Sequence, residues 1–260
     1  EPVILDTTNP NPKRQNTGFT TPWLALSHEY INGSTVYASY GEGVELFAAP
    51  NNANYLNAGQ FLGVQRSRQA ELGAKGQVGK ELSWNAAMFY IERPLAYDYA
   101  YERVVDGTQT HKGLDAGIQW RHQQWLLAGQ AQWLHARISD TSLNTDLNGS
   151  KPLNVPSYTL RALAQYRFAN VPGLRTSLRL SHEGARRVTE DGSINLPSWT
   201  TLDFATHYDT RIDGTRMQWT LAIDNLADRH YWRESPKQFG HYYLYPGAPR
   251  TVRVGVKASF

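Results

Sequence analysis

The last eleven residues of the chain alternate strictly between apolar and polar side chains. Val252, Val254, Val256, Ala258 and Phe260 fall on one side of an extended segment, and polar or charged residues fall on the other. A period of two indicates a β-strand with one apolar and one polar face. This strand is long and ends on an aromatic residue, a pattern typical of transmembrane β-barrels, whose strands face lipid on one side and a polar lumen on the other.

Composition is compatible with a membrane barrel but does not require one. The mean hydropathy is -0.55 and no long apolar run is present, so no transmembrane helix is predicted. Lumen-facing side chains lower the hydropathy of every barrel strand. The aromatic share of 12%, with 15 Tyr and 8 Trp, fits a barrel with aromatic girdles at both interfaces. An aromatic-rich β-sandwich has a similar composition, so composition alone leaves both architectures open.

The cysteine, charge and histidine content exclude several functions. Because the chain has no cysteine, it has no disulfide scaffold, thiolate metal site or cysteine nucleophile. The formal net charge of +3 is small and no basic run occurs, so nucleic acid is not an expected partner. The eight histidines are dispersed without helical ligand spacing, so no metal site is expected. The first residues show no signal peptide, so either it has been cleaved or the chain starts internally, and we favour the internal start.

Turn signals divide the chain into about eleven strands joined alternately by tight turns and long loops. Tight turns are expected at 31–34, 77–80, 122–123, 170–173 and 212–215. Long loops are expected over 1–21, 42–64, 94–110, 140–156, 184–197 and 228–249. This sorting by length indicates an all-β, antiparallel transmembrane barrel with short periplasmic turns and long extracellular loops, whereas a Greek-key sandwich would not sort its loops so regularly.

Two features of this strand pattern stay open. An odd count is unusual for a complete bacterial barrel, so we expect half of a larger barrel, although a further strand within 1–21 would restore an even count. In the strand near 124–138, Trp125, Leu127 and Trp133 compete with Leu126 and Leu134, so its lipid-facing side is not assigned.

Charged side chains recur on the polar faces of the strands. They are Glu71, Lys75, Arg161, Arg167, Arg175, Arg179, Asp203, Arg253 and Lys257. A charge facing the interior needs a partner or water, so these positions indicate a wet lumen or a polar plug. The excess of arginine favours an anionic cargo, and a ladder of ion pairs between neighbouring strands is the alternative.

Three segments in the last third carry a resemblance to a known family. They are 196–203 (LPSWTTLD), 223–232 (IDNLADRHYW) and 245–250 (YPGAPR), followed by the terminal VKASF. A strand ending in Asn-Leu-x-Asp-x-x-Tyr, a long loop, a Pro-Gly-x-Pro-Arg turn and a final strand ending in Phe resemble the C-terminus of TonB-dependent outer-membrane receptors, in particular the siderophore-receptor branch. Weaker similarity extends over nearly the whole chain, at 35–43, 69–75, 89–91, 113–117 and 154–157.

The resemblance implies a bacterial outer-membrane receptor barrel for TonB-dependent uptake of a ferric siderophore or similar metal chelate. Such receptors close about 22 strands around a plug. We expect residues 1–260 to form the C-terminal part of that barrel, with the plug domain absent, as a fragment, one part of a split receptor or a remnant. The implied partners are the chelate, the TonB complex through that plug, and outer-membrane lipid and lipopolysaccharide. No cofactor is implied, since iron would arrive inside a siderophore. Haem, cobalamin and nickel chelates remain open as cargo.

In such receptors external loops capture the ligand, and three aromatic groups are candidates here. Tyr97, Tyr99 and Tyr101 alternate, which would place their rings on one face against a chelate, or else in a lipid-facing girdle. In the loop at 228–249, cations beside aromatic rings suit an iron complex. The predicted contacts there are Trp232, Arg233, Phe239, Tyr242 and Tyr243, with Lys237 and His241 nearby, while Tyr231 and Tyr245 fit a girdle better. Phe47, Tyr55 and Phe61 form a third group in 42–64.

Two other functions fit parts of the pattern. A barrel enzyme, such as a lipase or protease, needs a nucleophile, a histidine and an acid gathered on the wall. The nearest grouping is Ser181-His182-Glu183, but strand alternation sends His182 to the opposite face from its neighbours. A soluble β-sheet protein that binds sugar or peptide would be extracted without detergent. We expect a receptor and not an enzyme.

Overall fold

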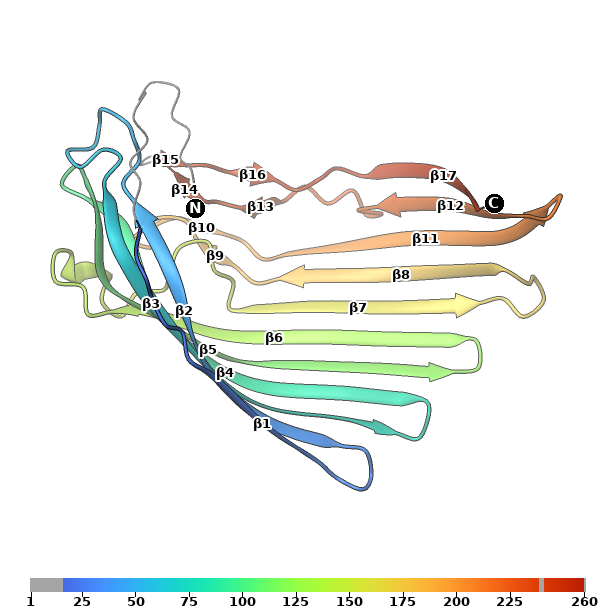
Figure 1. The fold of residues 1–260 in the computed structure, drawn as a ribbon. Helices are drawn as coiled ribbons and strands as arrows, with labels where there is room; N and C mark the ends of the chain where they lie inside the picture. Colours follow the sequence, from blue (N-terminus) through green and yellow to red (C-terminus); the bar gives the residue numbers. More distant parts are fainter. Residues whose placement is uncertain (1–15, 239–240, 260) are drawn as a thin grey trace.

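The computed structural model describes residues 16–238 and 241–259. Eleven strands form one antiparallel sheet, in which every strand pairs with the neighbouring sheet strand along the chain. Figure 1 shows this sheet as a curved wall with β1 at one edge and β17 at the other. The strands are β1 (Trp23–Glu29), β2 (Thr35–Ala48), β3 (Phe61–Val78), β4 (Leu82–Tyr99), β5 (Glu102–His122), β6 (Trp125–Ser139), β7 (Tyr158–Arg167), β8 (Leu174–Glu183), β11 (Trp199–Ile212), β12 (Thr215–Asp224) and β17 (Thr251–Ser259). The predicted eleven-stranded antiparallel sheet is confirmed.

Connections at the two ends of the sheet differ in length, as predicted. Tight turns join strands at one end, and the β11–β12 turn uses Asp213 and Gly214 at φ 48° and 81°. Longer segments join most strands at the other end, where Figure 1 shows them projecting beyond the sheet. They carry the 3-10 turn η1 (Thr145–Leu147) and the short strands β9 (Arg186–Arg187), β10 (Asn195–Leu196), β13 (Trp232–Glu234), β14 (Lys237–Gln238), β15 (His241–Tyr242) and β16 (Tyr245–Pro246).

One expected long loop is about half strand, and another is almost entirely strand. The loop expected at 42–64 is confined to 49–60, because β2 and β3 extend beyond the predicted ends. The loop expected at 94–110 is the outer half of a β4–β5 hairpin, closed by Ala100 and Tyr101 at φ 49° and 64°. Pro94 favours a break in the strand, yet β4 continues through it. The pairing with β5 shifts register between Pro94 and Ala96, and Gly107 on β5, at φ 92°, lies in this irregularity.

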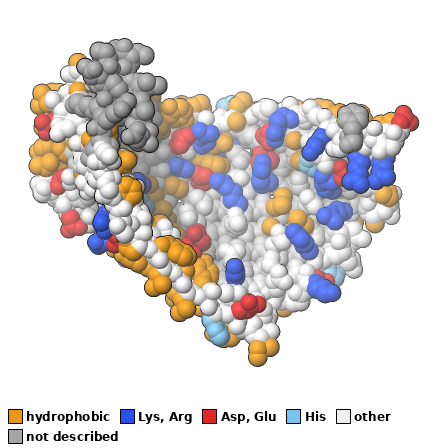
Figure 2. Space-filling view, viewed as in Figure 1, with side chains coloured by type: hydrophobic (Ala, Val, Ile, Leu, Met, Phe, Trp, Pro, Cys, Tyr) orange, Lys and Arg blue, Asp and Glu red, His pale blue; other side chains and the backbone are white. Residues whose placement is uncertain are grey.

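Strand alternation gives the sheet an apolar outer face and a polar inner face. Figure 2 shows basic and acidic side chains side by side over the hollowed inner face. The outer face carries large exposed hydrophobic side chains, among them Leu72, Met88, Leu114, Ile118, Leu160, Leu178, Leu221, Val252, Val254 and Val256. The structure also assigns β6: Trp125, Leu127 and Trp133 lie on the outer face, while Ala128 and Gln130 line a hollow on the inner face.

Aromatic residues mark both edges of the apolar outer face. Near the tight turns, Trp125 pairs with Tyr166 across β6 and β7, and their ring centroids lie 4.7 Å apart. At the opposite edge, Trp133 pairs with Tyr158 on the same two strands. Two such girdles separated by aliphatic residues are the outer surface of a membrane-spanning barrel wall. The described ranges contain no helix with the length and apolarity that a membrane crossing requires.

Candidate ligand-binding pocket at the loop end of the sheet

Residues that carry the family resemblance join the two ends of the 225–250 loop by hydrogen bonds. Asn225 is buried, has a φ of 50°, and accepts a hydrogen bond from the Arg229 amide at 2.8 Å. Its side-chain amide also donates to the carbonyl oxygens of Arg229 and Ala248, at 2.9 and 3.0 Å. The end of β12 is thereby tied to the segment that enters β17. These residues shape the loop base and are not presented to a ligand.

Tyr231 and Gly247 pack together at the same loop base. A Cβ at position 247 would come within 2.1 Å of the Tyr231 ring, so only glycine leaves room for it. The same ring packs against the buried Trp199 at a centroid distance of 4.6 Å. The girdle position expected for Tyr231 is therefore wrong, because the ring packs inside the protein.

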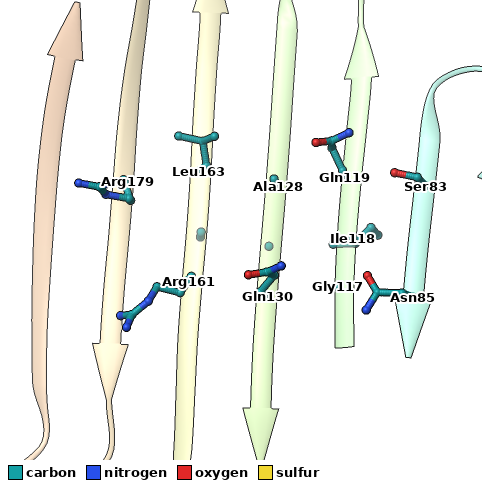
Figure 3. Close-up of a pocket in the computed structure, with 12 residues that line it drawn as sticks. Ser83, Asn85, Gly117, Ile118, Gln119, Ala128, Gln130, Arg161, Leu163 and Arg179 are labelled. Atoms are coloured by element: carbon teal, nitrogen blue, oxygen red, sulfur yellow. The ribbon is translucent and has the colours of Figure 1, made fainter. Parts of the chain in front are cut away.

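The inner wall below the loops is polar, and four of its arginines form ion pairs between neighbouring strands. Arg161 pairs with Glu183 at 2.9 Å, Arg179 with Asp203 at 3.0 Å and Arg253 with Asp224 at 2.8 Å, while Arg175 pairs with Asp209. The inter-strand ladder of ion pairs is confirmed for these pairs. Among the described residues, no ion pair is formed by the other charged residues named for the wall, which are Glu71, Lys75, Arg167 and Lys257. A hollow of about 330 Å³ lies on this wall, and Figure 3 shows its lining side chains spread over β4 to β8.

A larger pocket of about 500 Å³ lies at the loop end of the sheet. Leu95 and Tyr97 from β4, Ile138 from β6 and Leu147 from η1 form its buried apolar core. The side chains of Leu95 and Tyr97 point to the inner face of the sheet, because they alternate in β4 with the same period as Arg93. Further lining comes from β2, β4 and β5 and from the loops, whose lining residues are Pro50, Tyr55, Pro152, Leu153, Val155, Glu190 and Lys237.

Both tyrosines in the pocket donate their hydroxyl groups in hydrogen bonds to carboxylates. Tyr97 donates to Asp106 at 2.6 Å and Tyr55 donates to Asp98 at 3.0 Å. Burial, reinforced by these hydrogen bonds, raises the pKa of each phenol above its usual value. Both hydroxyl groups therefore keep their proton at neutral pH. The two tyrosines offer an aromatic surface to a ligand and are not phenolate ligands for iron.

Asp106 holds the 140–148 segment against the hairpin. Its carboxylate accepts hydrogen bonds from the amides of Ser142 and Leu143, at 3.0 Å each, and from the Ser142 hydroxyl at 2.8 Å. Desolvation alone would raise the pKa of Asp106, but the bonds from Tyr97 and this segment outweigh it and hold the pKa at about 2. The carboxylate is thus ionised at neutral pH and fixes one wall of the pocket.

Each described arginine or lysine that lines the pocket is paired with a carboxylate. Arg93 makes two hydrogen bonds to Glu45, at 2.6 and 3.1 Å. Arg103 bonds Asp98 at 3.0 Å, and Lys237 bonds Glu190 at 2.6 Å. Burial, followed by the nearby Arg93, lowers the pKa of His111, which also lines the pocket. His111 lies in β5 beyond the outer girdle, and its Nδ1 is buried without a hydrogen-bond partner.

The structure brings some of the predicted ligand residues together and leaves others apart. Tyr55 and Tyr97 line the pocket, and the Tyr99 ring stands edge-on to Tyr97 at 6.5 Å. Tyr101 occupies the hairpin turn and is 78% exposed, so the three rings do not share one face. Phe47 lies half-buried in β2 and does not line the pocket.

The predicted residues of the last long loop lie around the pocket edge or beyond it. Lys237 lines the pocket and lies 5.6 Å from the ring centroid of Tyr242. Trp232, Arg233 and Tyr243 are exposed, and Arg233 pairs with its neighbour Glu234. Phe239 lies outside the described residues.

Sequence reasoning missed several lining residues, above all Arg93, Arg103 and His111. They fall in or beside the segment expected to be a loop, where no face could be assigned. The alternation of Arg93, Leu95 and Tyr97 is the signal that could have found the first of them.

Neither a metal cluster nor a catalytic group is formed by the residues singled out. Within 16–238 and 241–259, no group of three or more His, Cys, Asp and Glu side chains could hold a metal ion. His182 faces outward and its Nδ1 lies 2.7 Å from the Thr200 hydroxyl, whereas Glu183 is tied to Arg161. Ser181, His182 and Glu183 therefore do not act together, as alternation predicts.

Comparison with known proteins agrees with this architecture. Residues 5–226 match the model of the family described as TonB dependent receptor-like, beta-barrel, and the chain belongs to this family. TonB-dependent receptors are outer-membrane transporters, so the chain is a bacterial outer-membrane barrel component and not an enzyme.

The relatives include receptors for ferric chelates. The ferrichrome receptor FcuA of Yersinia enterocolitica is 27% identical over 213 residues, covering 81% of this chain and 28% of that protein. The ferric-pyoverdine 358 receptor of Pseudomonas putida is 26% identical over 273 residues, covering 94% and 29% respectively. The chain therefore spans under a third of the length of these curated relatives.

Solved structures show the same fold. The ferric preacinetobactin receptor BauA of Acinetobacter baumannii superposes with a TM-score of 0.74 at 25% identity, over 91% of this chain and 36% of that one. The ferric yersiniabactin uptake receptor FyuA of Yersinia pestis gives a TM-score of 0.75 at 17% identity, over 92% and 37%.

Proposed function

We propose that this chain is part of an outer-membrane receptor that takes up a ferric siderophore or similar metal chelate in a TonB-dependent manner. The observation that carries the proposal is a pocket of about 500 Å³ with aromatic and apolar walls, at the loop end of a barrel wall of this receptor family. Pockets of this size, lined by aromatic residues with a few fixed polar groups, suit small organic ligands.

The proposed ligand contacts follow from the position of each side chain. Tyr55 and Tyr97 would pack against the chelate from the pocket wall, with Tyr99 beside them. Tyr101, Trp232, Arg233, Tyr242 and Tyr243 are exposed at the same end of the sheet and would meet the ligand on entry. Phe47 and Phe239 complete the proposed set.

We also propose that these eleven strands are the C-terminal part of a larger barrel. The sheet is open, with β1 and β17 each paired on one side, and all residues of β1 and those described in β17 are exposed. Unpaired strand edges cannot face lipid, because their backbone groups would lack hydrogen-bond partners. The remaining strands, the plug and the TonB contact would then lie outside residues 1–260, and outer-membrane lipid and lipopolysaccharide would cover the apolar face.

Uptake of radioactive iron by living cells tests the proposed function. Cells that lack the gene should lose uptake of at least one ferric chelate under iron limitation, and a plasmid copy should restore it. An uncoupler should abolish the restored uptake, since TonB-dependent transport is driven by the proton gradient. Unchanged uptake of every chelate tested in cells without the gene would reject the proposal.

A further inference from the structure

The pocket of about 500 Å³ at the loop end of the sheet is called the outer pocket from here on. The balance of its charged side chains restricts which chelates it can bind. Its three permanent cations, Arg93, Arg103 and Lys237, are each neutralised by a carboxylate of the protein at hydrogen-bond distance. The fourth basic group, His111, has a lowered pKa because it is buried and lies near Arg93. Among the described residues, this wall of the pocket therefore has no arginine or lysine without a carboxylate partner.

The carboxylates of two of these pairs are constrained by their surroundings, which opposes their separation. Asp98 bonds Arg103 and also accepts the Tyr55 hydroxyl. Glu45 receives both Arg93 contacts and its side chain is only 19% exposed. A highly charged anion in this pocket would lose its hydration and face Glu45, Asp98 and Glu190 without gaining a free cation, which is a net cost.

Iron chelates fall into charge classes that this pocket would distinguish. Three hydroxamate groups each carry one negative charge and cancel the charge of Fe³⁺, whereas three catecholate groups carry two each and leave three negative charges. A chelate without net charge can pack on the apolar lining formed by Leu95, Tyr97 and Ile138 and needs no free cation from the protein.

We infer that the outer pocket takes an iron chelate without net charge, of the hydroxamate class. This inference rests on the proposed receptor function and specifies its substrate class. It also replaces the anionic cargo that the arginine content favours, because four of the five arginines named for the wall are paired there, and both pocket arginines are paired as well.

The test compares two probes on the native receptor purified from outer membranes. A neutral ferric tris-hydroxamate and a ferric tris-catecholate are titrated against the protein, with tryptophan fluorescence as the readout. The hydroxamate should bind at least about tenfold more tightly, since one unfavourable charge contact near a protein surface is of that order. Its affinity should also change little between about 0.05 and 0.5 M salt.

Two variants expose one cation each. Glu45→Gln frees Arg93 and Glu190→Gln frees Lys237, so either should tighten tris-catecholate binding about tenfold at low salt and leave the neutral probe unaffected. Glu102→Gln makes the same charge change in the same hairpin, is exposed, and has no ion pair among the described residues, so it should alter neither affinity. Near-ultraviolet circular dichroism establishes that each variant is folded, and the second acid variant serves if the first is not.

The possible outcomes separate the inference from the function on which it rests. Tighter binding of the tris-catecholate by the unmodified receptor, or no gain in either acid variant, would overturn the neutral-chelate inference while the receptor function stands. Binding of neither probe, together with unchanged uptake in cells without the gene, would reject both.

Discussion

Asn225 shows how a residue of the family motif can act through structure alone. Its side chain joins three backbone groups from two segments, and its backbone has the positive φ that asparagine tolerates better than most residues. A buried amide that satisfies several backbone groups cannot be replaced without leaving some of them unpaired.

Replacing Asn225 with aspartate should destabilise the barrel wall. The change keeps the oxygen that accepts from Arg229 but removes both donors and places a carboxylate against two carbonyl oxygens. We expect a loss of about 2–4 kcal/mol in the free energy of unfolding, measured by urea titration in bilayers. Asn170→Asp, at an exposed turn position, should cost less than about 0.5 kcal/mol. Equal losses for the two variants would contradict the structural role of Asn225.

Asp106 has a similar role at the pocket wall. In Asp106→Asn the amides of Ser142 and Leu143 should exchange with solvent about fivefold faster or more, since each hydrogen bond contributes about 1 kcal/mol. Asp146→Asn, an exposed change in the same segment, should have no effect.

Acid should release the same contact. The folded pKa of about 2 lies below the ordinary value of 3.8, so the stabilisation is complete above about pH 4 and is lost as the pH falls toward 2. Exchange of the two amides, corrected for intrinsic rates, should rise in that window. A rise above pH 5 would instead implicate another group.

At the scale of elements, the β4–β5 hairpin carries the pocket beyond the membrane. Its turn uses positive φ at Ala100 and Tyr101, the conformation of a mirror-type hairpin turn that favours Asn or Gly. The Tyr101 carbonyl in this turn also accepts a hydrogen bond from the Leu56 amide at 2.8 Å. This bond holds the 49–60 loop against the hairpin tip.

Substitutions at position 100 should shift the stability of this tip in opposite directions. Ala100→Asn should stabilise it by about 0.5 kcal/mol and slow exchange of the Leu56 amide, whereas Ala100→Val should destabilise it by about 1–2 kcal/mol. Exchange that changes in the same direction in both variants would contradict the turn assignment.

Local patterns predict the strands better than they predict the pocket. Alternation and turn residues are local, so eleven strands and the sorting of connections follow from the sequence. The sequence predicts a loop over 94–110, where proline and glycine favour a break in a strand, but pairing with β5 across an irregular ladder keeps the segment in the sheet. Tyr55 and Tyr97 could be singled out as aromatic loop residues. The Glu45–Arg93 pair could not, because its partners are 48 residues apart and meet only through the register of three strands.

At the scale of the whole molecule, the two faces of the wall have different solvents. Leu178 lies on the outer face near the middle of β8, and Ser177 faces the lumen beside it. Leu178→Arg should cost about 2–4 kcal/mol for folding into bilayers, while Ser177→Arg should cost much less because water reaches the lumen. Equal costs, measured by the fraction folded after bilayer insertion, would contradict the assignment of faces.

The central claim is that a ferric chelate binds in the outer pocket of this receptor wall. The most direct measurement is hydrogen exchange of the native receptor with and without a saturating ferric hydroxamate. The account predicts slower exchange in the β4–β5 hairpin tip, the 140–157 segment and the loops that carry Glu190 and Lys237. Protection confined to the strands around the inner-wall hollow, or no protection at saturation, would contradict it.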